Sequence, residues 1–133
     1  MFDAAPEDWR QVVLRDVVEI VTVGISADEI AAKPEVSHYS LPAFDLGFGP
    51  EVGPGKTIKS NKTLVPNDCI LFSKLNPRIP RIWRVRGIAS PESYCSTEFW
   101  PLVQKSAGVD LDFLTYFLGS AAFLGDPAIV PSS

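Results

Sequence analysis

The stretch FSKLNPRIPRIWRVR, residues 72 to 86, combines side chains that can bind phosphates and nucleobases. An arginine guanidinium is planar and always charged, so it can hold a phosphate or the O6/N7 edge of guanine through two hydrogen bonds. Asn76 could bind adenine in the same two-point manner. The stretch contains no acid and five basic residues, which are Lys74, Arg78, Arg81, Arg84 and Arg86.

A second basic segment lies just before this stretch. Lysines recur at three-residue intervals, at Lys56, Lys59 and Lys62, with Ser60 and Asn61 among them. This spacing suits a loop that follows a phosphate backbone. The alternative is that both segments are simply solvated strand faces, and the residues alone leave that alternative open.

The charges of the chain are unevenly distributed. The 133 residues have a formal net charge of -4. Residues 56 to 86 contain eight basic residues and one acid, a net charge of +7, whereas the remainder contains four basic residues and fifteen acids, a net charge of -11. A polarised molecule of this kind can bind a polyanion through one face, so overall acidity does not exclude DNA.

The tripeptide Gly55-Lys56-Thr57 invites comparison with a nucleotide-binding phosphate loop. Such a loop places four residues between its first glycine and the Gly-Lys pair, whereas five residues separate Gly49 from Gly55 and the first of them, Pro50, is proline. The sequence that follows, IKSNKTLVPND, is also unsuited to the helix that must hold the phosphates. We interpret this tripeptide as part of a flexible basic loop.

Other catalytic and metal-binding patterns are also missing from the sequence. The single histidine, His38, has no evident nucleophile to activate, and Glu98-Phe99-Trp100 lacks the lysine of the acid-x-Lys nuclease pattern. Two cysteines and one histidine at these spacings do not form a metal site, and no glycine-rich turn suggests a nucleotide cofactor. The sequence therefore predicts a chain that is not an enzyme and needs no cofactor or metal.

Several features favour a cytoplasmic protein without membrane contacts. No apolar run approaches the roughly 18 residues that cross a bilayer. The opening MFDAAPEDWRQ is acidic, unlike a signal peptide. Cys69 and Cys95 are more typical of two buried thiols than of a disulfide.

Length and composition predict one compact domain, since 133 residues with 46% hydrophobic residues can bury one core. In its first half, residues 9–24 predict a helical turn that runs into a first strand ending at Gly24. Ser26 and Glu29 form a capping box for a short helix that Pro34 ends. Residues 38–45 should be extended, and the glycines and prolines of residues 47–55 predict a loop.

The second half predicts short strands at residues 58–65, 69–75, 81–89 and 96–103, and then a helix capped by Asp110. Alternation in RIWRVR places Arg84 and Arg86 on one face of a strand, opposite Trp83 and Val85. The expected fold is mixed α/β (α+β), with short strands in a twisted mixed or antiparallel sheet and a few helices. Apolar residues recur at helical spacing near the end, at Leu111, Leu114, Phe117, Leu118 and Ala121.

Ordered motifs along the chain resemble a known family. They are IKSNK (58–62), LVPNDCILFSKLNPRIPRIW (64–83), CSTEFWPL (95–102) and FLTYFLGSAAF (113–123), and the opening LRDVVEI (14–20) fits the same pattern. From about residue 10 to about residue 124, the chain resembles the target recognition domain of the DNA specificity (S) subunit of type I restriction-modification systems. The whole chain, residues 1–133, is thus expected to be one such domain, truncated at its C-terminus before the family's long spacer helix.

The resemblance implies a function without catalysis. Such a subunit has two recognition domains, each of which reads half of a bipartite site in double-stranded DNA. It docks methyltransferase subunits, which flip and methylate adenine, and works with restriction subunits in the full complex.

The resemblance also divides the expected DNA contacts into two groups. A signature shared by a whole family does not distinguish one member's target from another's, so the basic residues are expected to contact phosphates. These are Lys56, Lys59, Ser60, Lys62, Lys74, Asn76, Arg78, Arg81 and Arg84. Base readout is expected from the variable-looking loop HYSLPAFDLGFGPEVGPGK (38–56), with His38, Tyr39, Ser40, Phe44 and Asp45 as candidates.

One alternative comes from the class of interaction proteins. The aromatic helix from Phe113 to Phe123 could pack on a missing spacer helix or on another copy of the chain. The chain would then be an assembly fragment, for example a homodimer, that does not bind DNA.

Overall fold

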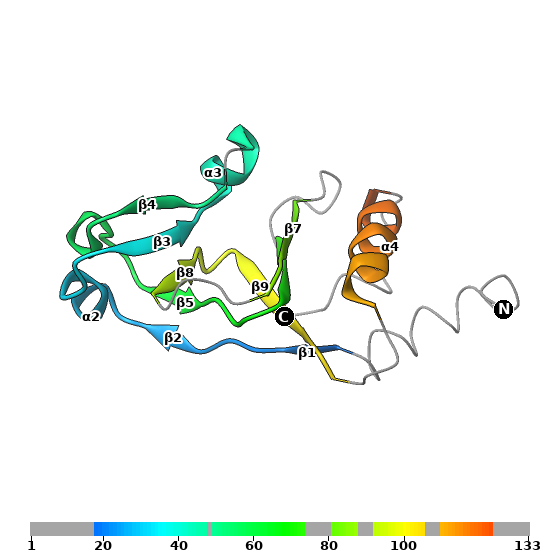
Figure 1. The fold of residues 1–133 in the computed structure, drawn as a ribbon, viewed down its shortest axis with the longest axis horizontal. Coiled ribbons are helices and arrows are strands. Elements are labelled where there is room, and N and C mark those ends of the chain that lie inside the picture. Colours follow the sequence, from blue (N-terminus) through cyan, green and yellow to red (C-terminus); the bar gives the residue numbers. More distant parts are fainter. Residues whose placement is uncertain (1–17, 48, 74–80, 88–91, 106–109, 124–133) are drawn as a thin grey trace, which may run out of the picture.

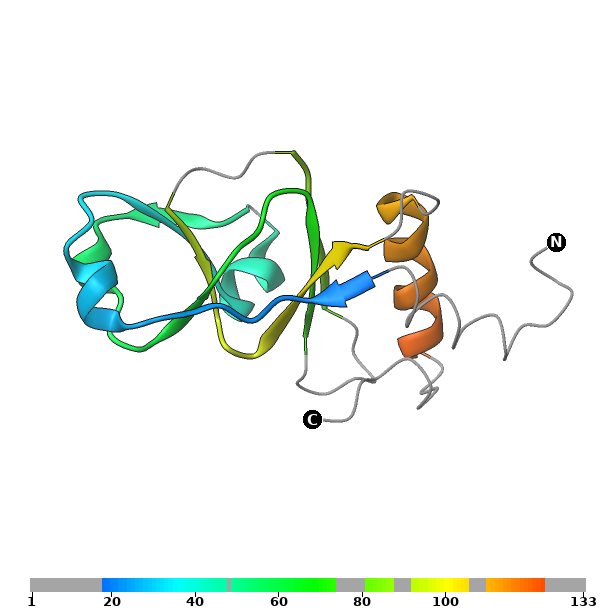
Figure 2. The same ribbon diagram turned by 90° about the horizontal axis from the view of Figure 1, so that it is seen from below.

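The computed structural model describes residues 18–47, 49–73, 81–87, 92–105 and 110–123. These residues form two sheets, with two short helices beside one sheet and a longer helix against the other (Figures 1 and 2). The mixed α+β class expected from the sequence is confirmed. The strands form two separate sheets, however, where a single sheet was expected.

The first sheet has four antiparallel strands in the order β1-β9-β6-β7. Their bounds are Val18–Ile20 for β1, Cys69–Ser73 for β6, Ile82–Val85 for β7 and Phe99–Gln104 for β9. Every residue of the central strand β6 is buried, because both faces of this sheet are covered. Ile70 and Phe72 face helix α4 (Leu111–Phe123), whereas Cys69 and Leu71 face the second sheet.

The second sheet has five strands in the order β2-β5-β8-β3-β4. Their bounds are Gly24–Ile25 for β2, Val36–Tyr39 for β3, Glu51–Gly53 for β4, Lys62–Leu64 for β5 and Ser93–Cys95 for β8. Only the pair β3 and β8 is parallel. One face contributes Tyr39 and Cys95 to the core between the sheets. The other face packs Val36 and Tyr94 against Ile30 of helix α2 (Ala27–Ala31).

The helix caps expected from the sequence are present. The Ser26 side chain accepts a hydrogen bond from the Glu29 amide, and Glu29 Oε1 accepts one from the Ser26 amide. At α4, Asp110 Oδ1 accepts a hydrogen bond from the Asp112 amide at 2.9 Å. Both helices therefore begin where the sequence predicts, and each supplies one apolar layer.

The expectation that residues 38–45 are extended is wrong beyond Tyr39. Residues Leu41–Leu46 form helix α3. Ser40 caps it by accepting from the Ala43 amide at 3.1 Å, Pro42 suits its first turn, and Gly47 ends it in the left-handed conformation with φ 77°. The segment thus carries both a start and a stop signal for a helix.

Several strands differ from their expected bounds. The first strand, expected to end at Gly24, ends at Ile20, and Gly24 begins β2 in the other sheet. The strand expected at 96–103 begins only at Phe99. The predicted loop 47–55 contains β4, which pairs with β3. The strand expected at 58–65 is reduced to β5, because residues Gly55–Thr57 form a 3-10 turn, η1, and an irregular stretch follows it. Strand β8 was not expected, since it has only three residues, SYC, directly before the predicted strand at 96–103. The helical turn predicted before the first strand lies outside the described residues.

Candidate nucleic-acid interface

Residues Gly55 to Lys62, here called the lysine segment, are fixed against helix α2 near both ends. The Gly55 amide donates to the Lys33 carbonyl at 3.0 Å, and Asn61 Oδ1 accepts from the Ala27 amide at 3.0 Å. A Cβ atom at Gly55 would lie 1.9 Å from the Ile30 carbonyl oxygen, so glycine allows this close approach. The lysine segment is therefore an anchored element, where the sequence suggested a flexible loop.

The lysines of this segment form no ion pair with any described residue. Lys56 and Lys59 are exposed, and Lys62 is half-buried at the start of β5. Within the residues that the structure describes, no carboxylate oxygen lies within 4.0 Å of their ammonium groups. Their charges are therefore available to an external anion. Ser60, the other residue of this segment that was expected to contact DNA phosphates, is also exposed.

A cavity of about 560 Å³ lies beside the lysine segment. Apolar residues such as Val36 and Ile58 form part of its wall, and the polar part of its lining consists of His38, Glu51, Thr57, Lys59 and Lys62. Burial lowers the pKa of the Lys62 ammonium. The cavity thus combines cationic groups with an apolar wall.

His38 occupies an unusual position in this cavity wall. Its side chain is 20% exposed, and its Nε2 atom is buried without a hydrogen-bond partner among the described residues. Burial is the main cause that lowers its pKa, and Lys62 adds to the effect. Glu51 Oε1 lies 3.7 Å from Nδ1 and acts in the opposite direction, but the other two causes outweigh it. His38 is therefore neutral at neutral pH, and its contact with Glu51 is not an ion pair there.

The described arginines of the cationic stretch, Arg81, Arg84 and Arg86, are paired with acids. Arg81 Nε and Nη2 donate to the two carboxylate oxygens of Asp45, at 3.0 and 3.2 Å. Arg84 donates to Asp112 at 2.9 Å and to Asp68 at 2.8 Å, and its side chain is only 14% exposed. Asp45 and Asp112 lie outside residues 56–86 of the sequence, so part of the charge excess of those residues is balanced locally.

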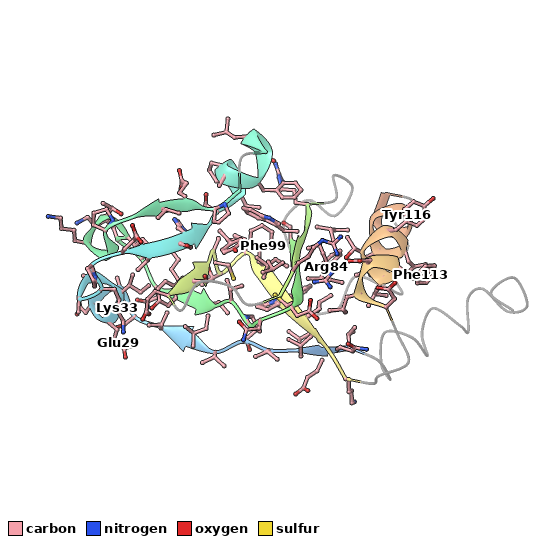
Figure 3. All side chains as sticks on the ribbon, viewed as in Figure 1. Glu29, Lys33, Arg84, Phe99, Phe113 and Tyr116 are labelled. Carbon is pink, nitrogen blue, oxygen red and sulfur yellow. The ribbon has the colours of Figure 1, made fainter. Side chains whose placement is uncertain are left out.

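Arg84 links the four-stranded sheet to α4 (Figure 3). Arg84 and Arg86 lie on one face of their strand, as the sequence predicted, while Trp83 and Val85 face the core between the sheets. Arg86 also donates to Asp112, at 2.6 Å. Hydrogen bonds from Arg86 and Arg84 lower the pKa of Asp112, and those from Arg84 and the Gly87 amide lower the pKa of Asp68.

The candidate readout residues divide into buried and exposed groups. Tyr39 and Ser40 are 8% and 7% exposed, so in this arrangement they support the fold and do not face solvent. The ring of Phe44 packs edge-on against Trp83, with centroids 5.6 Å apart. Asp45 is exposed but bound to Arg81. Of these four candidates, the two on α3, Phe44 and Asp45, are therefore more exposed than Tyr39 and Ser40; Figure 1 shows α3 at the end of β3.

The structure brings only some of the predicted residues together. Lys59, Lys62 and His38 line one cavity. Arg84 lies on β7 of the other sheet, and Arg81 directly precedes that strand. Lys74, Asn76 and Arg78 lie outside the described residues. Sequence reasoning did not identify Glu51 and Thr57 as neighbours of His38, because the pairing of β3 with β4 brings Glu51 there.

Neither a metal cluster nor a membrane helix is found in the described ranges. No group of three or more metal-ligating side chains is present there, and no helix there has both the length and the apolarity to cross a bilayer. The buried thiols expected at Cys69 and Cys95 are confirmed, and burial raises the pKa of Cys69 to about 12.

Comparison with protein-family models finds no match for the sequence, and comparison with curated proteins finds no significant match.

Proposed function

We propose that the chain is a sequence-specific DNA-binding domain, the target recognition domain of a type I restriction-modification specificity subunit. In this role it binds double-stranded DNA and directs the methyltransferase and restriction subunits of the full complex to their site. The observation that supports DNA binding most directly is the set of unpaired charges at Lys56, Lys59 and Lys62 on an anchored segment. The family assignment rests on the ordered sequence motifs.

The lysine segment is the better candidate for contact with the phosphate backbone. A lysine without an internal partner releases only water and counterions when it binds a phosphate. Arg81 and Arg84 must first give up, or share, their bonds to Asp45, Asp68 and Asp112. In this proposal these arginines hold the framework of the domain and add phosphate contacts only at its edge.

Base readout is assigned to α3 and the connection that follows it. Asp45 and Leu46 are exposed at the end of this helix, and Leu46 is 66% exposed. Gly47 and Gly49 have positive φ angles of 77° and 91°, so the chain can turn sharply there. A short helix bordered by turns can present a few side chains to a groove.

The proposal is tested by selecting bound molecules from a pool of randomised duplexes. A target recognition domain should enrich one short sequence, and its affinity should fall steeply as salt concentration rises. If the chain binds no duplex even at low salt, the proposal is wrong. If it binds all duplexes equally, DNA binding holds but target recognition fails.

A second candidate function is assembly through α4. Its aromatic residues Phe113 and Tyr116 are 37% and 77% exposed, and both point away from the sheet (Figure 3). The rings of Phe113 and Phe117 stack with centroids 6.3 Å apart. An exposed aromatic row suits association with a second copy or with another helix. This role is compatible with DNA binding but does not require it.

The proposed function also assigns a compartment. A restriction-modification subunit acts on DNA within the cell, so we assign the chain to the cytoplasm. Detecting the chain in a cytoplasmic fraction together with cellular DNA would test this assignment.

A further inference from the structure

The cavity beside the lysine segment has an excess of positive charge. Two ammonium groups, on Lys59 and Lys62, line it together with one carboxylate, on Glu51. That carboxylate lies 3.7 Å from His38 Nδ1, and its side chain is 62% exposed, so solvent weakens its field. Neither ammonium group has a carboxylate within ion-pair distance in the described ranges.

Lys62 in particular lacks the compensation that a half-buried cation needs. Folding removes part of the water around the Lys62 side chain, and this desolvation disfavours its charged form. Buried cations are usually paired with an anion for this reason. An anion that enters the cavity would offset this desolvation.

We propose that the cavity formed by His38, Thr57, Lys59 and Lys62 binds a phosphoryl group. Two neighbouring ammonium groups can donate to different oxygens of one phosphate, which has more acceptor oxygens and more charge than a carboxylate. The apolar wall, which includes Val36, Pro54 and Ile58, can pack against the organic part of the ligand. The phosphoryl group belongs either to a DNA backbone or to a small phosphate compound. The first of these alternatives rests on the proposed function.

His38 provides a direct measurement of this binding. It is the single histidine of the chain, so its ring signals in an NMR spectrum need no assignment. The charged groups that face it are Glu51 and Lys62, and Lys59 lines the same cavity. A bound phosphate opposes the effect of Lys62 and favours the imidazolium form, so the pKa of His38 should rise.

The experiment titrates the folded chain with inorganic phosphate, with a mononucleotide and with a short duplex, at constant ionic strength kept with chloride. The His38 ring signals are expected to shift and saturate. Lys62→Met keeps most of the side-chain length but removes the charge, so it should weaken phosphate binding about tenfold, the effect of losing one charge-assisted hydrogen bond. Lys33→Met is the matched control, because Lys33 pairs with Glu92 and does not line the cavity.

The outcomes distinguish DNA from a small compound as the source of the phosphoryl group. They also distinguish failure of this inference from failure of the proposed function. Saturation by inorganic phosphate or the mononucleotide supports a site for small phosphate compounds, even if the duplex does not bind. Saturation by the duplex alone supports a backbone phosphate as the ligand. If the duplex binds in a mobility-shift assay but no titrant moves the His38 signals, the proposed function stands and this inference is wrong. Equal effects of Lys62→Met and Lys33→Met would also overturn it.

Discussion

Arg81 and Asp45 form an ion pair with two hydrogen bonds, Nε to Oδ1 at 3.0 Å and Nη2 to Oδ2 at 3.2 Å. The pair joins the residue before β7 to helix α3, 36 positions apart in the sequence. The sequence predicted a phosphate contact for Arg81 and base readout for Asp45. Their pairing means that any change at one of them alters the charge that the other presents to DNA.

Replacing Asp45 should therefore release Arg81. In Asp45→Asn the guanidinium loses its carboxylate partner and becomes available to a phosphate. We expect tighter binding to unrelated duplexes, with a salt dependence steeper by about 0.9 in log-log slope if one phosphate contact is gained. Fluorescence anisotropy over a series of salt concentrations measures both quantities.

Arg81→Ala is the partner experiment for that prediction. It should weaken binding to matched and unrelated duplexes alike, because it removes a phosphate contact at the edge of the interface and leaves the Asp45 carboxylate without its cationic partner. Loss of sequence preference alone in Arg81→Ala would contradict the assignment of Arg81 to the backbone. An unchanged slope in Asp45→Asn would show that the released guanidinium does not reach a phosphate.

Gly55→Ala should damage the lysine segment. The added Cβ would meet the Ile30 carbonyl oxygen at 1.9 Å, so either η1 or α2 must move. Such overpacking costs about 1–3 kcal/mol of stability and should also weaken DNA binding. Gly53→Ala is the control, since nothing lies within 4 Å of a Cβ there. Equal midpoints of urea unfolding for the two variants would contradict this account.

His38 should make the stability of the protein depend on pH. Its pKa in the folded state lies below the ordinary 6.5. The unfolded chain therefore binds the proton first as the pH falls. The free energy of unfolding should be highest above pH 6.5 and should decline below it, by at most about 1.4 kcal/mol per pH unit, until the folded state is also protonated.

Urea unfolding between about pH 8 and about pH 5 measures this effect, since histidine is the side chain that ordinarily titrates there. His38→Gln removes the titrating group and should give a nearly constant free energy of unfolding over that range. A wild-type stability that rises as the pH falls would mean that Glu51 dominates the environment of His38.

The exposed aromatics of α4 predict self-association. If they form an interface, the wild-type chain should sediment as a dimer, and Tyr116→Asp should shift it to a monomer because a charge is costly to bury. Leu46→Asp is the matched control, since Leu46 is also exposed but lies on α3. A wild-type monomer at all concentrations would rule out assembly through a second copy of the chain.

The features predicted correctly from the sequence depend on neighbouring residues. The Ser26 capping box and the two faces of β7 follow from spacings of two or three residues. Helix α3 was missed because its 6 residues are too short to show a helical period, although Ser40, Pro42 and Gly47 together mark its ends. Strand β8 was missed because three residues give too little alternation to recognise.

The candidate site was harder to predict than these local features, because it depends on contacts between residues that are far apart in the sequence. The charge excess of residues 56–86 suggested that all its basic residues were available. Folding instead brings Asp45 to Arg81 and Asp112 to Arg84, over separations of 36 and 28 residues. Neither pairing could be inferred without the order of the strands. The spacing of the lysines did identify the basic segment that forms no ion pair with the described part of the chain.

The central claim is that the lysine segment binds the phosphate backbone of DNA. The most direct test compares the salt dependence of duplex binding in Lys56→Gln/Lys59→Gln/Lys62→Gln with that of Lys33→Gln, whose lysine is already paired with Glu92. The account predicts that the triple variant loses about 0.9 in log-log slope for each phosphate contact, up to about 2.7 in total, while Lys33→Gln keeps the wild-type slope. A folded triple variant with the wild-type slope and affinity would contradict the account.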